Sequence, residues 1–364
     1  MRIRSVETSI VDIPFHDGGK GEGIGPTTWN RLEIVLVRVE DEDGHVGWGE
    51  GFGYFVTDAT KAIVDRLIAP LLVGTDVDDV PSWNLATQRR LHLFGRHGIT
   101  IFALSGVDIA LWDLKAKRAG IPLYRLLGRT TPAQPVPFYA SLVRYADDSV
   151  ATAVCEQALA DGFDELKLHE ITVPHVRACR DAVGPDVPIA VDVNCAWSAD
   201  AAREAIPELI ELNASWLEEP IFPPEDAAAL AGLRGRGLPI AAGENACTVE
   251  PFRQMLAARA IDLAQPSVTK VGGVSEFLRV AEACAAAGVP LLPHCPYFGP
   301  GMHASLHLAA AQPGVRQLEW LYVRPEAWLA PLGDPGPGGT YVPSERPGLG
   351  FEPDPDVLAH FRRA

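Results

Sequence analysis

Six polar residues recur through the second half of the chain, and each of them closes a short apolar run. They are Lys167, Asp192, Glu218, Glu244, His294 and Glu319. They lie about 25 residues apart, except for one interval of about twice that length, near whose middle Ser267 stands. A repeat of this length accommodates one strand, one helix and two loops, which is the unit of a (β/α)₈ barrel. Ionisable residues at successive strand ends therefore indicate a catalytic barrel and are hard to explain by packing.

Three of these residues, Asp192, Glu218 and Glu244, are carboxylates that end three successive predicted strands. The carboxyl ends of parallel barrel strands meet on one face, so the three side chains would repel one another unless a cation lay between them. Carboxylate oxygens are the ligands that Mg²⁺ prefers in proteins. We therefore predict one Mg²⁺ per subunit at these residues. Three separate surface acids are the alternative interpretation.

The segments that would hold these residues alternate between strand-like and helical patterns after residue 134. We predict strands at residues 136–141, 165–169, 189–194, 215–218, 240–243, 263–267, 291–294 and 317–320. Alanine-rich helices, such as those expected at residues 151–160, 201–212 and 275–287, lie between them. Strict alternation favours an α/β protein with a (β/α)₈ (TIM-type) barrel over a doubly wound sheet, because no GxGxxG motif follows the first strand.

The first 130 residues predict a separate, small α+β domain, and residues 131–326 the barrel. Residues 32–39 form a clear strand, and the turn at 41–44 leads into a second strand of a hairpin. Positions 59, 63, 67 and 71 fit one face of a helix, and a longer helix is expected at about 100–119. The segment 15–30 is glycine-rich and predicts a loop. The tail, residues 327–364, is expected to return to the N-terminal domain.

Composition limits the partners of the chain. The net charge of −16 repels polyphosphates, so nucleic acid is not expected as a partner. No apolar run approaches the length of a membrane helix, and the N-terminus lacks the apolar core of a signal peptide. The six scattered cysteines contain no CxxC motif and are typical of reduced thiols in a cytoplasmic protein. We expect a homo-oligomer that acts on a small carboxylate.

Several motifs together closely resemble the mandelate racemase/muconate lactonizing enzyme branch of the enolase superfamily. They are Gly162-Phe163-x-x-Leu166-Lys167-x-His169, Val191-Asp192-x-Asn194-x-x-Trp197, Trp216-Leu217-Glu218-Glu219-Pro220, Gly243-Glu244-Asn245, Lys270-x-Gly272-Gly273-Val274 and Pro293-His294. The segment from Asp108 to Lys115 is similar to a helix of that family's capping domain. The resemblance spans nearly the whole chain. It implies a modified barrel with an N-terminal α+β capping domain completed by the C-terminal tail.

The resemblance also implies a reaction and the residues that carry it. A base removes the proton α to a substrate carboxylate, and Mg²⁺ on Asp192, Glu218 and Glu244 stabilises the enediolate. Glu219 would be structural, and Glu319 would donate a hydrogen bond to the substrate carboxylate. The glycine-rich segment 18–23 and the segment 51–56 match the loops that close over substrate, with Tyr54 and Phe55 as candidate contacts. The substrate-binding residues that we predict are Tyr54, Ser141 and Asn194.

His169 is the first departure from the family pattern, since a second lysine is usual there. Side chains two residues apart share a face of a strand, so Lys167 and His169 point the same way. An imidazole titrates near neutral pH without the lowered pKa that a lysine base needs. Either His169 is the base and Lys167 faces the substrate carboxylate, or His169 binds substrate and Lys167 takes the proton. A structural histidine is the third interpretation.

Ser267 is the second departure, because many members place an aspartate there as the partner of the strand-seven histidine. Without that carboxylate, His294 should be a weaker base, although it could still act as a general acid. This argues against a symmetrical two-base racemase and suits β-elimination of a hydroxyl or opening of a lactone or anhydro ring. Lys270 is expected to support the site.

Dehydration of a sugar acid is therefore the predicted activity. Racemisation, epimerisation or cycloisomerisation of a carboxylate or acid-sugar lactone is the alternative. A non-catalytic binding barrel predicts loss of a metal carboxylate, whereas all three are present. A Zn²⁺ hydrolase predicts HxH on the first strand, where Tyr139-Ala140-Ser141 stands. His303 and His307 lack the Glu of a HExxH motif and are interpreted as helix-face histidines.

Overall fold

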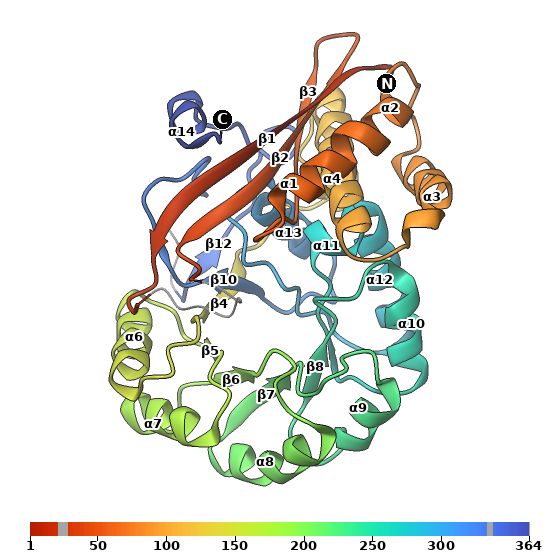
Figure 1. Ribbon diagram of the computed structural model, residues 1–364. Helices are drawn as coiled ribbons and strands as arrows, with labels where there is room; N and C mark the ends of the chain where they lie inside the picture. Colours follow the sequence, from red (N-terminus) through yellow and green to blue (C-terminus); the bar gives the residue numbers. More distant parts are fainter. Residues whose placement is uncertain (21–27, 333–337, 364) are drawn as a thin grey trace.

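Seven parallel strands form the centre of the C-terminal part of the protein, which Figure 1 shows below the N-terminal strands. The computed structural model describes residues 1–20, 28–332 and 338–363. The barrel strands are β4 (Val136–Ser141), β5 (Leu166–Leu168), β6 (Ile189–Asp192), β7 (Ala214–Glu218), β8 (Ile240–Ala242), β9 (Leu263–Ala264) and β10 (Leu318–Leu321). Each pairs with the next up to β9, and β10 pairs with β4. The predicted barrel is confirmed.

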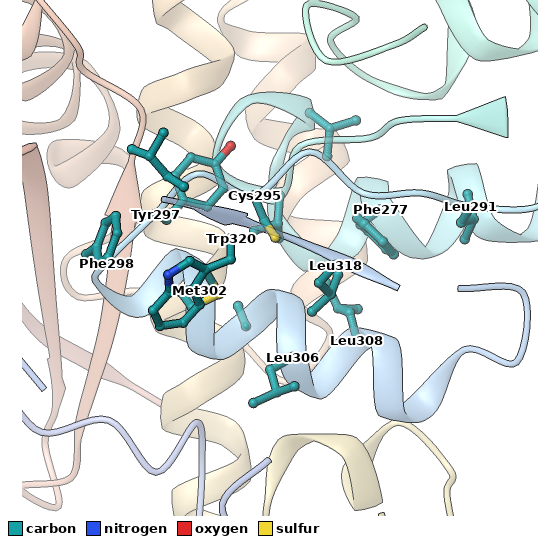
Figure 2. Close-up of a cluster of buried hydrophobic side chains, with 14 of the residues drawn as sticks. Phe277, Leu291, Cys295, Tyr297, Phe298, Met302, Leu306, Leu308, Leu318 and Trp320 are labelled. Atoms are coloured by element: carbon teal, nitrogen blue, oxygen red, sulfur yellow. The ribbon is translucent and has the colours of Figure 1, made fainter. Parts of the chain in front are cut away.

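The strand predicted at 291–294 is not a strand in the structure. Only Leu291 forms bridges there, to Ala264 on one side and to Val315 on the other. Pro293 and Pro296 explain this, because proline has no N–H to donate to a ladder. Apolar side chains of α12 (Gly273–Ala287), α13 (Pro300–Ala311) and β10 pack beside this irregular segment instead, as Figure 2 shows for Phe277, Leu308 and Leu318.

The barrel helices form an outer layer around these strands (Figure 1). They are α6 (Asp148–Ala160), α7 (Val173–Val183), α8 (Ala199–Glu211), α9 (Ala227–Leu233), α10 (Val249–Ala257), α11 (Val268–Val271), α12 (Gly273–Ala287) and α13 (Pro300–Ala311). Side-chain caps begin several of them. Asp147, for example, accepts hydrogen bonds from the backbone N–H groups of Ser149 and Val150 at the start of α6.

The N-terminal domain is an antiparallel sheet packed on helices. Its strands are β1 (Ile3–His16), β2 (Arg31–Asp41) and β3 (Val46–Gly51), and its helices are α1 (Thr57–Ile63), η1 (Val64–Ile68), α2 (Ala69–Leu72), α3 (Val80–Arg90), η2 (His92–Phe94), α4 (Ile99–Ala119) and α5 (Leu123–Leu126). β3 approaches α4 so closely that a Cβ atom at Gly49 would lie 1.9 Å from the carbonyl oxygen of Gly106. The predicted helix at 100–119 is confirmed.

Two features of this domain differ from the predictions, the end of its first strand and the buried face of its first helical segment. Phe15 and His16 belong to β1 and not to the glycine-rich loop, of which residues 21–27 lie outside the described part of the chain. The apolar face predicted along residues 59–71 is offset by one position. The fully buried residues there are Thr60, Val64, Ile68 and Leu72, so the offset is already present before the π-helical turn that begins at Val64.

Buried polar contacts join the N-terminal domain to the barrel. Asp108 on α4 accepts hydrogen bonds from the backbone N–H of Ser275 (3.0 Å) and from the amide of Asn84 (2.7 Å). The indole of Trp112 donates to the Ser275 hydroxyl (2.9 Å). The helix that resembled a capping-domain element is therefore bonded directly to α12 of the barrel.

The C-terminal segment returns to the N-terminal domain and also touches the barrel. β11 (Arg324–Pro325) pairs with β1, β12 (Thr340–Tyr341) pairs with β4, and α14 (Pro355–Phe361) ends the helical part. The Arg363 guanidinium binds Asp12 (2.7 Å) and Glu33 (3.0 Å). The other oxygen of Glu33 accepts the backbone N–H of Phe55 (2.7 Å), so the tail is linked to the loop over the barrel mouth.

The six cysteines are free thiols. Among the described residues, no helix combines the length and the apolar character that crossing a membrane would require.

Candidate active site

The three predicted metal ligands meet at the carboxyl ends of β6, β7 and β8. Asp192 and Glu218 are the last residues of neighbouring strands and stand in register, while Glu244 follows β8 after a bend at Gly243. A Cβ atom at Gly243 would lie 2.6 Å from the Phe252 ring, and its φ of 133° favours glycine. One oxygen from each of the three carboxylates lies within 4.8 Å of the others.

This donor set fits a hard divalent cation. An octahedral Mg²⁺ with bonds of about 2.0–2.1 Å needs its oxygens roughly 3–4 Å apart, and the 4.8 Å limit on the distances between these carboxylate oxygens is compatible with that. The carboxylates of Asp192 and Glu218 are completely buried, so their charges need compensation inside the protein. In the described part of the chain, the other group of possible ligands is Asp41, Asp43 and His45, where the carboxylates already bind Arg118.

Lys167 lies at the centre of the carboxylates. Its Nζ is 2.8 Å from Glu218 Oε1, 2.9 Å from Glu319 Oε1 and 3.3 Å from Asp192 Oδ2. Burial alone would lower the pKa of Lys167, but the surrounding negative charges outweigh it and raise that pKa well above its usual value. The ammonium group is therefore held in place by three acceptors.

His169 is oriented by a carbonyl group. Its Nδ1 donates a hydrogen bond to the backbone oxygen of Leu142, and its Nε2 lies 3.2 Å from Asp192 Oδ2. Burial would lower the pKa of His169, but the Asp192 carboxylate outweighs burial and raises it. The hydrogen bond to Leu142 fixes the tautomer, so Nε2 is the ring atom that can exchange a proton at the cavity.

His294 has hydroxyl partners on its inner side. Its Nδ1 lies 3.1 Å from Ser267 Oγ and 3.4 Å from Tyr297 Oη, and these two hydroxyls also bond to each other. Its Nε2 lies 3.1 Å from Glu244 Oε2. Burial lowers the pKa of His294 more than Glu244 and Glu319 raise it. The direction agrees with the weak base expected without an aspartate at position 267.

Glu319 lies opposite, on β10, and is ionised in this arrangement. Burial would raise its pKa, but Lys167 and His294 lower it to about 2. Its Oε2 accepts the backbone N–H of Cys295 (3.1 Å). A role as hydrogen-bond donor to substrate therefore needs an added proton, which an arriving carboxylate would favour by raising the pKa of Glu319.

Glu219 and Lys270 support the metal ligands from outside. Both oxygens of Glu219 accept hydrogen bonds from the Asn245 amide (3.0 and 3.1 Å), so this side chain is turned away from the three ligands. Lys270 donates to Asn245 (2.7 Å) and to Glu244 (3.2 Å). The structural role of Glu219 and the supporting role of Lys270 stay predictions.

A cavity of about 270 Å³ opens onto this cluster between the barrel and the N-terminal domain. Its wall contains Tyr54, Ser141 and Asn194, the three predicted substrate contacts, together with His169, His294 and Glu319. A larger cavity of about 490 Å³ lies beside α10 and includes Arg96 and His97 but none of the three metal ligands. The smaller cavity is therefore the candidate active site.

Several residues of this site were missed in the sequence. Tyr297 partners His294, and Trp29 and Phe52 line the cavity from the N-terminal domain. The position of Tyr297, three residues after His294, was the available signal, but a loop without periodicity does not predict which side chain turns inward.

Models of known protein families match both parts of the chain. Residues 150–357 match the family described as "Enolase C-terminal domain-like", and residues 21–128 match "Mandelate racemase / muconate lactonizing enzyme, N-terminal domain". The chain is 33% identical to the arabinonate dehydratase of Saccharolobus solfataricus, over 77% of each chain. It is 30% identical to the D-galactarolactone cycloisomerase of Agrobacterium fabrum, over 100% of this chain and 99% of the relative.

The fold also matches that of a solved structure over nearly the full length of the chain. The chain superposes on the crystal structure of a racemase from Streptomyces coelicolor A3(2) with bound magnesium, with a TM-score of 0.86 and 29% identity. The match covers 99% of this chain and 100% of the other.

Proposed function

The chain belongs to the mandelate racemase/muconate lactonizing enzyme family of the enolase superfamily, and from this we propose that it is a Mg²⁺-dependent sugar-acid dehydratase. It would remove the proton α to the carboxylate and eliminate the β-hydroxyl group. The observation that carries this proposal is the meeting of Asp192, Glu218 and Glu244 within 4.8 Å beside a cavity that also contains two histidines. Mg²⁺ at these carboxylates would supply the positive charge that stabilises the dianion left by proton loss.

We assign the base to His169. Its Nδ1–H is committed to Leu142, so Nε2 is the ring atom that faces the cavity wall. Nε2 contacts Asp192 (3.2 Å) in this structure, and it would become the proton acceptor once Mg²⁺ held that carboxylate. Lys167 is held as an ammonium by three carboxylates and suits recognition of the substrate carboxylate and its developing charge. Proton abstraction by Lys167 is the alternative, and it needs the loss of a proton that these contacts retain.

We assign the general acid to His294, on the other side of the cavity. Elimination requires one group to take the α-proton and another to protonate the departing hydroxyl. The Ser267 and Tyr297 hydroxyls orient the ring through Nδ1 without adding the negative charge that would make it a strong base. This asymmetry between His169 and His294 favours elimination over two-base racemisation.

Cycloisomerisation is the second candidate. The similarity to a D-galactarolactone cycloisomerase covers the whole chain, and the same acid could protonate a ring oxygen instead of a hydroxyl. The two reactions share the first proton transfer and differ in the leaving oxygen, so the product distinguishes them.

The test is a series of sugar acids incubated with the enzyme and Mg²⁺ in D₂O, with α-proton exchange and product followed by NMR. We expect exchange for at least one acid, with loss of water or ring opening. His169→Asn should abolish exchange, whereas His294→Asn should retain it and lose product. Undiminished exchange in His169→Asn would move the base to Lys167. Absence of exchange with every acid, together with absence of Mg²⁺ binding, would refute the proposal.

A further inference from the structure

We infer that the substrate is a monocarboxylate whose far end is a deoxygenated carbon, such as a methyl group, and not a second carboxylate or a hydroxymethyl group. This inference rests on the proposed function, because it concerns the far wall of the same cavity. It follows from the chemistry of the residues around that wall.

Alternation along the barrel strands arranges the site in two layers. The inner layer contains Ser141, Lys167, Asp192 and Glu319. Two residues further along the same segments stand Val143, His169, Asn194 and Leu321, all of which line the cavity. The inner layer is polar throughout. The outer layer is polar beside β5 and β6 but apolar beside β4 and β10.

The N-terminal domain covers this opening with aromatic side chains. Trp29, Phe52, Tyr54 and Phe55 all line the cavity. The Tyr54 ring lies 5.1 Å from the Trp29 ring and 4.8 Å from the Phe52 ring. The Tyr54 hydroxyl donates to the carbonyl oxygen of Pro296 and is therefore already used. These rings offer apolar surface, not hydrogen bonds, to the far end of a ligand.

The basic side chains that line the cavity are already paired with carboxylates. In the described part of the chain they are Lys270, His169 and His294, and each contacts a metal-ligand carboxylate. Arg144 does not line the cavity, and its guanidinium donates to the His169 carbonyl (2.9 Å) and to Asn194 Oδ1 (3.3 Å). The sequences of 21–27 and 333–337 contain no Lys, Arg or His. A second carboxylate would therefore be buried without a counter-charge, which is the most costly form of polar burial.

A methyl group at the far end of the substrate would instead be stabilised by burial. It gains burial against Val143, Leu321 and the aromatic rings and leaves no polar atom unsatisfied. The indole N–H of Trp29 has no acceptor among the described residues, but it is fully buried and offers no hydrogen bond to the cavity. The small volume, about 270 Å³, also suits a compact acid.

The experiment uses sets of three acids that differ only at carbon 6 and share the configuration at carbons 2 to 5. Each set contains a 6-deoxyhexonate, the hexonate and the hexarate. We expect kcat/KM to fall in that order within the set that the enzyme accepts, by about tenfold for the hydroxyl and at least about a hundredfold for the carboxylate. A hexarate that reacts as well as its 6-deoxy relative would overturn the inference while leaving the proposed function intact, and would direct attention to Arg144.

A variant tests whether the wall causes the preference. Phe55 is 42% exposed at the cavity, so Phe55→Arg adds a cation with little disturbance of the core. Phe55→Arg should reduce the ratio of kcat/KM for the 6-deoxyhexonate to kcat/KM for the hexarate by at least about tenfold. Phe222→Arg is the matched control, because Phe222 is also exposed (74%) and does not line this cavity. The inference would be overturned if this ratio of kcat/KM values were unchanged in Phe55→Arg, or if it changed equally in Phe55→Arg and Phe222→Arg. Absence of α-proton exchange with every acid would instead refute the proposed function, and the inference with it.

Discussion

Two buried histidines should make the protein lose stability at acid pH. His303 and His307 lie on α13, and their Nε2 atoms donate to the carbonyl oxygens of Ala330 and Leu349 (3.2 Å each). The Nδ1 of His307 accepts the backbone N–H of Tyr124 (3.2 Å). Burial lowers the pKa of His303 to about 4 and that of His307 to about 3, because a charged ring would lose its hydration.

The magnitude follows from the difference between the folded and unfolded pKa values. An unfolded histidine titrates near 6.5, so the folded values are lowered. The neutral rings therefore contribute stability that is fully present above about pH 6.5 and is lost as the pH falls towards 4 and 3. At pH 5 only the unfolded chain has bound these protons, which costs about 2 kcal/mol for each histidine and about 4 kcal/mol for both. Domains are typically stable by about 5–15 kcal/mol, so the loss is large.

Urea unfolding between pH 5 and pH 8 measures this effect in the wild type and in the double variant His303→Gln/His307→Gln. Glutamine stays neutral, so the change in unfolding free energy across this range should shrink by about 4 kcal/mol. Burial raises the pKa of Glu50 and of Asp108 to about 7, which acts in the opposite direction but is common to both proteins. His360→Gln, at an exposed position of α14, is the control. An unchanged pH dependence in the double variant would refute the reasoning.

Three further predictions concern the site. Mg²⁺ at about 100 times its Kd should stabilise the fold by about 2.7 kcal/mol in thermal unfolding. Glu218→Gln should abolish this gain and Glu219→Gln should keep it, and equal loss in both would contradict the ligand assignment. Arg363→Met should raise KM more than it lowers kcat in steady-state kinetics, because the Phe55 loop loses its support through Glu33, and an effect on kcat alone would contradict this. Tyr297→Phe should slow product formation by about tenfold while α-proton exchange in D₂O continues, and equal loss of both would place Tyr297 outside the acid step.

The barrel and its metal ligands could be predicted from the sequence because strand ends recur at a regular interval. Asp192, Glu218 and Glu244 each follow a short apolar run, and parallel strands bring such positions to one face. The seventh strand could not be predicted correctly. An apolar run before His294 resembled the others, and the prolines around it prevented regular pairing.

The environment of each reactive group depended on tertiary contacts that no local pattern contains. The absence of an aspartate at position 267 was visible, but its replacement by a pair of hydroxyls required Tyr297 to turn inward from a loop. The aromatic wall likewise combines Trp29 and Phe52 with Leu321, which are far apart in the chain. The one-position offset of the helical face, which begins at Thr60, depended on packing, because positions 59, 63, 67 and 71 have the same spacing as positions 60, 64, 68 and 72.

The link from Arg363 through Glu33 to the backbone of Phe55 has a consequence for biosynthesis. Strands and helices near the N-terminus can form as they leave the ribosome, since domains tend to fold in the order of synthesis. The contacts of Asp12 and of one Glu33 oxygen with the Arg363 guanidinium nevertheless form only after residue 363 has been translated and has left the exit tunnel. A nascent chain with a complete barrel but without residue 363 would therefore hold its aromatic loop without this support.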